Sequence, residues 1–179
     1  MASVEEEAGA ASAAPKMTYL SPIASPLLEG KSLRRSLKLI QLAADRERAS
    51  RGKKGEEKSE AKKGKKGVKL LRRGVHEVTK CLRKGVKGIV FFASDVFPVE
   101  IIAHLPILCE EKDIVYAYLC SKKTLGHAFR SKRPASVIMI TPGGDGQPGE
   151  DAGGEDDEEK FEDVYKKVAK LVRKNNPYF

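Results

Sequence analysis

Several features that define large protein classes are missing from this sequence. Its apolar runs do not approach the ~20 residues of a transmembrane helix, so we expect no membrane span. The first residues, MASVEEEAGAASAAP, are acidic and have no apolar core, so they do not predict a secretory signal. Three cysteines are too few and too scattered for a disulfide framework, which favours a reducing compartment.

Catalytic signatures are missing as well. The sequence contains no Walker A motif and no G-x-S-x-G motif. A G-x-G-x-x-G match at 144–149 is rejected, because Asp145 and Glu150 would repel a pyrophosphate. The remaining candidate ligands show no metal spacing: His76, His104, His127, Cys81, Cys109 and Cys120. We therefore expect a protein that is not an enzyme, with no catalytic residue, no metal and no cofactor.

Two alternatives concern single residues. A transferase or hydrolase that uses Cys120 or His127 is one alternative, and the sequence contains no constellation of residues that supports it. His104, within the helical stretch AHLPIL, is expected to be a packed structural histidine.

What the sequence does have is positive charge in blocks. It carries 34 Lys and Arg against 25 Asp and Glu, a net charge of +9. The net charge is −3 over 1–30, +10 over 31–69, +6 over 70–140 and −4 over 141–179. Such a basic middle between acidic ends predicts a polyanionic partner that binds the centre of the chain.

Composition also predicts the domain organisation. The Lys-rich stretch 51–69 has no aromatic residue and no apolar residue larger than Val. It therefore cannot bury enough apolar surface to offset the entropy lost on ordering. It could be a solvated linker, or an arm that contacts RNA phosphate or directs nuclear import. The expected segments are an acidic, flexible tail (1–30), a basic helix packed on the core (31–49), a Lys-rich disordered insert (50–67), the core domain (68–142), an acidic Gly-rich linker (143–159) and a C-terminal helix of the core (160–174).

Strands and helices alternate within the core domain. The apolar runs GIVFFAS (88–94), IVYAYLC (114–120) and ASVIMIT (135–141) predict buried strands. Helices are expected at 74–85, after Ser121, and after an N-cap region at Asp95 with Pro98 in the first turn and an interruption at Pro106. This alternation predicts an α/β fold, a compact three-layer sandwich.

One short segment, LRRGVHEVTK, carries a chemical pattern. On a helix that starts after Gly74, the side chains of His76, Glu77 and Lys80 project to one side near the N-terminus, where phosphates bind readily. A carboxylate among cations would repel phosphate, but it could accept hydrogen bonds from the amino or imino groups of bases. On spacing alone, a solvated helix face with an incidental Glu–Lys pair is the favoured interpretation of the segment.

A family resemblance adds to this interpretation. GVHEVTK, then IVFFASDVFPVEIIAHLPILCEEKDIVYAYLCSKKTLGHA and SKRPASVIMI, resemble the kink-turn-binding family of small RNA-binding proteins, which includes ribosomal proteins and subunits of small nucleolar ribonucleoproteins. The resemblance covers about residues 68–141. Its RGV-x-E-V start and KRP-x-SV segment are most similar to the branch of box H/ACA particles. It implies an α-β-α sandwich with a mixed sheet of about four strands and five helices.

The resemblance also implies positions that contact RNA. The residues at the helix start, from Gly74 to Lys80, would sit on the sheared G·A pairs of a kink-turn. Ile101 and Lys122 would border the pocket of a flipped-out nucleotide, and the loop 130–136 would close over the RNA. Members with strong kink-turn specificity have Asn where this chain has His76, which implies a permissive binder recruited partly by proteins. The implied RNA-binding residues are Arg73, Gly74, His76, Glu77, Lys80, Ile101, Lys122, Arg133 and Ala135.

The partners implied by the resemblance are those of an H/ACA particle. They are the H/ACA guide RNA, a dyskerin-type pseudouridine synthase subunit and the small linker subunit of the particle. The implied role is a non-catalytic, RNA-binding one in pseudouridylation of ribosomal RNA, in the nucleus and nucleolus. Other interpretations are a spliceosomal or box C/D kink-turn-binding subunit, a ribosomal protein, and a protein-interaction adaptor with incidental RNA contact.

Overall fold

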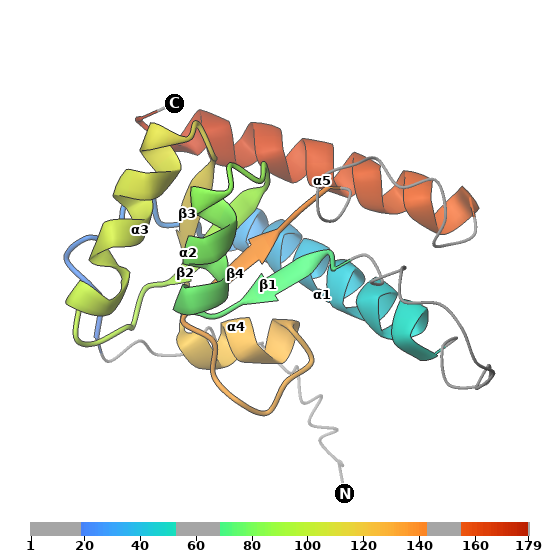
Figure 1. Ribbon diagram of the computed structural model, residues 1–179, viewed down its shortest axis with the longest axis horizontal. Coiled ribbons are helices and arrows are strands. Elements are labelled where there is room, and N and C mark those ends of the chain that lie inside the picture. Colours follow the sequence, from blue (N-terminus) through green and yellow to red (C-terminus); the bar gives the residue numbers. More distant parts are fainter. Residues whose placement is uncertain (1–18, 53–68, 143–154, 179) are drawn as a thin grey trace, which may run out of the picture.

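The computed structural model describes residues 19–52, 69–142 and 155–178 (Figure 1). In these ranges the chain forms a mixed four-stranded sheet with strand order β1-β4-β2-β3, in which β2 and β3 are parallel and β4 is antiparallel to both β1 and β2. The elements in chain order are α1 (Gly30–Gly52), β1 (Leu71–Arg73), α2 (Val75–Arg83), β2 (Ile89–Ala93), α3 (Glu100–Glu111), β3 (Tyr116–Leu119), α4 (Lys122–Ala128), β4 (Val137–Ile140) and α5 (Glu155–Asn175).

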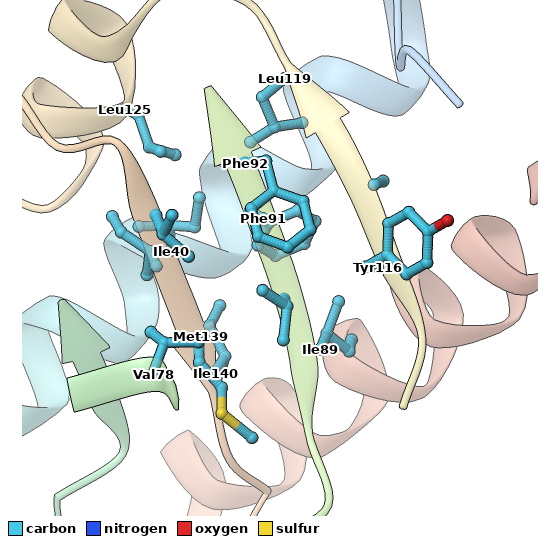
Figure 2. Close-up of a cluster of buried hydrophobic side chains, with 14 of the residues drawn as sticks. Ile40, Val78, Ile89, Phe91, Phe92, Tyr116, Leu119, Leu125, Met139 and Ile140 are labelled. Carbon is cyan, nitrogen blue, oxygen red and sulfur yellow. The ribbon is translucent and has the colours of Figure 1, made fainter. Parts of the chain in front are cut away.

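Helices cover both faces of this sheet. α2 and α3 pack together on one face, while α1 and α5 pack together on the other, and α4 lies against α1 at one end (Figure 1). Every residue of β2, β3 and β4 is buried, because each strand lies between two helical layers. Figure 2 shows the resulting core, in which Ile40 of α1, Val78 of α2 and Phe92 of β2 contribute side chains. The expected α/β three-layer sandwich with a mixed sheet is confirmed.

The segment before α1 differs from the expected flexible tail. Leu27 forms a parallel bridge with Tyr118 at the edge of β3. The backbone N–H of Leu28 donates to the carbonyl of Tyr118 over 2.8 Å, and the N–H of Tyr118 donates to the carbonyl of Pro26 over 2.8 Å. Ser21 and Leu28 are each 2% exposed. Residues 19–29 therefore protect the free edge of the sheet, where unpaired backbone groups would otherwise lie.

The third helix corrects two expectations. Asp95 does not cap α3, because the N-cap of that helix is Val99, for which the described residues show no side-chain capping bond. The Oδ1 atom of Asp95 instead accepts a hydrogen bond from the backbone N–H of Lys122 over 2.6 Å, at the start of α4. Pro106 lies inside α3 without interrupting it. The helix stays continuous because buried residues on both sides of the proline, Leu105 and Cys109, hold it against the core.

His104 also differs from its expected packed position. Its side chain is exposed, because the buried stripe of α3 runs through Ile102, Leu105 and Cys109 and leaves residue 104 on the outer side. The C-terminal helix begins at Glu155, earlier than the expected residue 160. Most of the Lys-rich insert, and 143–154 of the acidic linker, lie outside the described residues.

All three cysteines are buried thiols. Burial, and secondarily the neighbouring Glu110 carboxylate, raises the pKa of Cys109 to about 12. An unfolded cysteine titrates near pH 8.5, so above that pH the unfolded state loses a proton that the folded state keeps. The folded protein is therefore destabilised as the pH rises from about 8.5 towards 12.

This linkage predicts a measurable loss of stability at alkaline pH. Between about pH 7.5 and 9.5 the free energy of unfolding should fall by about 1.4 kcal/mol more in the native protein than in a Cys109→Ala variant. Chemical denaturation at both pH values in reducing buffer measures the difference. Parallel decreases in the two proteins would show that Cys109 is not the responsible group.

Candidate nucleic-acid interface

The predicted RNA-binding residues come together at one end of the sheet. Arg73, the last residue of β1, lies opposite Ile138 near the start of antiparallel β4. The carboxyl ends of the parallel strands β2 and β3 lie beside the start of β4. Ala93, the last residue of β2, is in register with Leu119 of β3, and the N–H of Ala93 donates to the carbonyl of Ser136 over 2.8 Å. We call this end of the sheet, with the segments that follow β1, β2 and β3 and precede β4, the site edge.

The first part of the site edge is the start of α2. Gly74 has φ 93° and ψ 152°, a backbone conformation essentially restricted to glycine, and its N–H donates to the carbonyl of Val137 over 2.9 Å. Among the described residues, no side chain caps the helix there, so its first N–H groups are left to other partners. His76, Glu77 and Lys80 are all exposed, as expected from the helical spacing, while the opposite face is buried.

Arg73 has a different environment from these three residues. Its guanidinium donates to Ser131 Oγ over 2.8 Å and to the carbonyl of Pro134 over 3.5 Å, and it lies 5.4 Å from the ring centroid of Phe129. These contacts hold the loop 130–136 against the end of β1. Within the described residues, the side chain is thus engaged in positioning the loop, and its contact with RNA stays a prediction.

The loop 130–136 is held from several directions. The N–H of Ala135 donates to the carbonyl of Lys122 over 3.0 Å, and the N–H of Ser131 donates to the carbonyl of Gly126 over 3.0 Å. A Cβ atom on Gly126 would clash with the carbonyl oxygen of Arg133, so only glycine allows this close approach. Arg133 is exposed at the surface of the loop, while Ala135 is buried beneath it.

The start of α4 forms the third part of the site edge. Ser121 Oγ accepts from the N–H of Thr124 over 3.3 Å, which confirms the expected cap, and Ser94 Oγ donates to the carbonyl of Cys120 over 2.9 Å. Together with the carboxylate of Asp95, these bonds fix the backbone of Lys122, whose side chain is half-buried.

Apolar side chains are exposed beside the start of α4. Ile101 on α3 is 44% exposed, and Phe97 in the preceding turn is 74% exposed. The ring of Tyr19 meets Phe97 edge-on with centroids 5.9 Å apart. Tyr19 was missed by sequence reasoning because it lies in the segment expected to be a tail. The site edge therefore combines a helix N-terminus, cations, one carboxylate and exposed aromatic surface.

Other kinds of site find no support in the part of the chain that the structure describes. No group of three or more His, Cys, Asp or Glu side chains in those ranges could hold a metal ion. Among the described helices, none is sufficiently long and apolar to span a membrane.

Comparison with protein families agrees with this architecture. The pattern of the family described as Ribosomal protein L7Ae/L30e/S12e/Gadd45 matches residues 54–147. The chain belongs to this family. Among solved structures, the Giardia lamblia 15.5kD RNA binding protein has a similar fold, with a TM-score of 0.57 at 23% identity over 85% of this chain and 99% of that chain.

Curated relatives place the chain near one branch of the family. It is 43% identical over 103 residues to the H/ACA ribonucleoprotein complex subunit nhp2 of Schizosaccharomyces pombe, covering 58% of this chain and 66% of that protein. It is 37% identical over 126 residues to the H/ACA ribonucleoprotein complex subunit 2-like protein of Xenopus laevis, covering 70% of each chain. The matched segment thus spans about two thirds of the length of these relatives.

Proposed function

We propose that the protein is the RNA-binding subunit of a box H/ACA ribonucleoprotein and binds its guide RNA. The observation that carries the proposal is the exposed trio His76, Glu77 and Lys80 at an uncapped helix start, on the same sheet end as Lys122 and the loop 130–136. The names of the curated relatives support the same particle.

The parts of the site edge suggest a division of labour on RNA. The first N–H groups of α2, together with Lys80 and Arg133, suit phosphate oxygens, which provide affinity and fix the orientation of the RNA. The carboxylate of Glu77 can only accept hydrogen bonds when ionised, so it suits the amino or imino groups of bases. The exposed surface of Phe97 and Ile101 suits an unpaired base, because single-stranded RNA is commonly held by stacking on aromatic side chains.

Within the particle the protein would act without catalysing the reaction itself. It would hold the guide RNA so that a dyskerin-type pseudouridine synthase subunit modifies ribosomal RNA, and a small linker subunit would bridge the two proteins. This role places the protein in the nucleus, and in particular in the nucleolus. Recruitment by protein partners also fits His76, which offers one donor and one acceptor in a geometry different from that of an amide.

A comparison of two RNAs tests the choice of particle. Filter binding of the full chain to an isolated kink-turn RNA and to an H/ACA guide hairpin, at one fixed salt concentration, should show modest affinities that differ little between them. Tight binding to the kink-turn alone would instead assign the protein to a spliceosomal, box C/D or ribosomal role.

A further inference from the structure

The outer faces of α1 and α5 carry rows of exposed cations that the site edge does not include. Both rows follow the three- and four-residue spacing that places side chains on one side of a helix. Within these helices, the large apolar residues face the core instead. We call the following residues the α1–α5 basic face: Lys31, Arg34, Arg35 and Lys38 of α1 with Lys167, Lys170 and Lys174 of α5.

The two rows lie next to each other. The start of α1 and the end of α5 are both attached to β3, because Leu28 donates to the carbonyl of Tyr118 and the side-chain amide of Asn176 donates to the carbonyl of Tyr116 over 3.1 Å. At the other end, the guanidinium of Arg46 lies 5.4 Å from the ring centroid of Phe161. The helices therefore run antiparallel on one face of the sheet (Figure 1), with their basic halves together.

The charge of this face is not neutralised by its described surroundings. α1 has no acidic residue before Asp45, and α5 has none after Asp163. Two ion pairs involve other cations of α5, Lys166 with Glu162 and Arg173 with Asp113. They do not include any of the seven cations of the face. Glu29, just before α1, is the acidic residue that adjoins the row in sequence. Seven cations thus face solvent with little compensation.

The face also has no apolar anchor. The exposed large hydrophobic residues of the described ranges are Tyr19, Leu20, Phe97, Ile101, Ile107 and Tyr178, none of which lies in α1 or α5. Protein interfaces usually depend on buried aromatic or aliphatic anchors, and base stacking requires aromatic rings. A phosphodiester backbone requires only cations, so it is the partner that fits this surface.

We propose that the α1–α5 basic face binds the phosphate backbone of a double-stranded stem of the RNA whose loop is held at the site edge. The inference rests on the proposed RNA-binding function. Continuity between the two surfaces supports it, because Arg130 at the end of α4 pairs with Asp45 of α1 over 3.1 Å. The guanidinium of Arg48 also donates to the carbonyl of Arg130. A duplex leaving the loop at the site edge therefore reaches α1 first near Asp45, about two helical turns after Lys38, and has to run along the helix to contact the basic face.

A salt titration with matched variants tests the inference. The full chain and the triple variant Arg34→Gln, Arg35→Gln, Lys38→Gln are compared on a hairpin RNA with a long duplex stem and on the same hairpin with its stem truncated. On the long stem, the variant should lose at least about tenfold in affinity at low salt. The slope of log K against log salt is negative and should become shallower by about 2 to 3, at ~0.9 per lost phosphate contact. On the truncated hairpin both proteins should bind alike.

The control removes the same charge elsewhere. Arg83→Gln, Lys84→Gln, Lys112→Gln changes exposed residues of α2 and the end of α3, on the opposite face of the sheet. Equal slopes for the two triple variants would overturn the inference, as would a gain in affinity, which would indicate that an acidic segment of the chain occupies the face. If Glu77→Ala has no effect while the α1 variant weakens binding, the proposed site fails and the duplex-binding face stands.

Discussion

Glu77→Ala should weaken binding of the guide RNA by roughly tenfold or more, although it removes a negative charge from an RNA-facing helix. The direction of the change in affinity distinguishes base contacts from phosphate contacts. If the RNA were held by phosphate contacts alone, loss of a carboxylate would reduce repulsion and raise the affinity. A loss of affinity requires that the carboxylate accepts hydrogen bonds from bases, which are worth about 1–3 kcal/mol for a good pair. Filter binding at fixed salt measures the effect.

Two controls separate base readout from general charge effects. Glu111→Ala removes an exposed carboxylate at the end of α3, away from the site edge, and should leave the affinity unchanged or slightly raised. Lys62→Ala in the Lys-rich insert should weaken binding less than Glu77→Ala does, and uniformly across RNA sequences. Equal losses for Glu77→Ala and Lys62→Ala would count against base readout by Glu77.

Gly126→Ala should reduce both stability and RNA binding. The added Cβ cannot be accommodated without moving the backbone of Arg133 and Pro134, because it would clash with a carbonyl oxygen. Overpacking of this kind typically lowers the free energy of unfolding by about 1–3 kcal/mol. Since the displaced segment carries Arg133 and covers Ala135, we also expect at least about a tenfold loss of RNA affinity under conditions where the variant is folded.

The second effect needs a control for simple destabilisation. Val172→Ala truncates a buried side chain of α5 far along the chain from the loop and should cost a comparable amount of stability. Its RNA affinity should stay close to that of the native protein at a temperature where both variants are folded, as monitored by circular dichroism. A similar loss of affinity in both variants would show that the position of the loop does not matter.

The buried strands, and their alternation with helices, could be predicted from the sequence. A short run rich in β-branched and aromatic residues, such as IVFFA, is typical of a strand covered on both faces. The short strand β1 could not, since three residues with two arginines give no periodic signal. The pairing of residues 19–29 with β3 was also missed, because backbone bonding at a sheet edge depends on tertiary position and leaves little trace in composition.

The part of the candidate site that depends on local spacing could be predicted from the sequence, and the part that depends on long-range contacts could not. The exposed face of His76, Glu77 and Lys80 follows from helical spacing after a glycine, which is a local property. The structural engagement of Arg73 and Asp95 could not be predicted, because their partners lie 58 and 27 residues away in the sequence. Long-range polar contacts of this kind decide which charged residues remain available to RNA.

The most direct test of the proposed function is to sequence the RNAs that copurify with the full chain from cells after crosslinking. We expect enrichment of box H/ACA guide RNAs over other small nucleolar RNAs, and loss of that enrichment in the Glu77→Ala variant. Enrichment of box C/D, spliceosomal or ribosomal RNAs, or no enriched RNA, would contradict it.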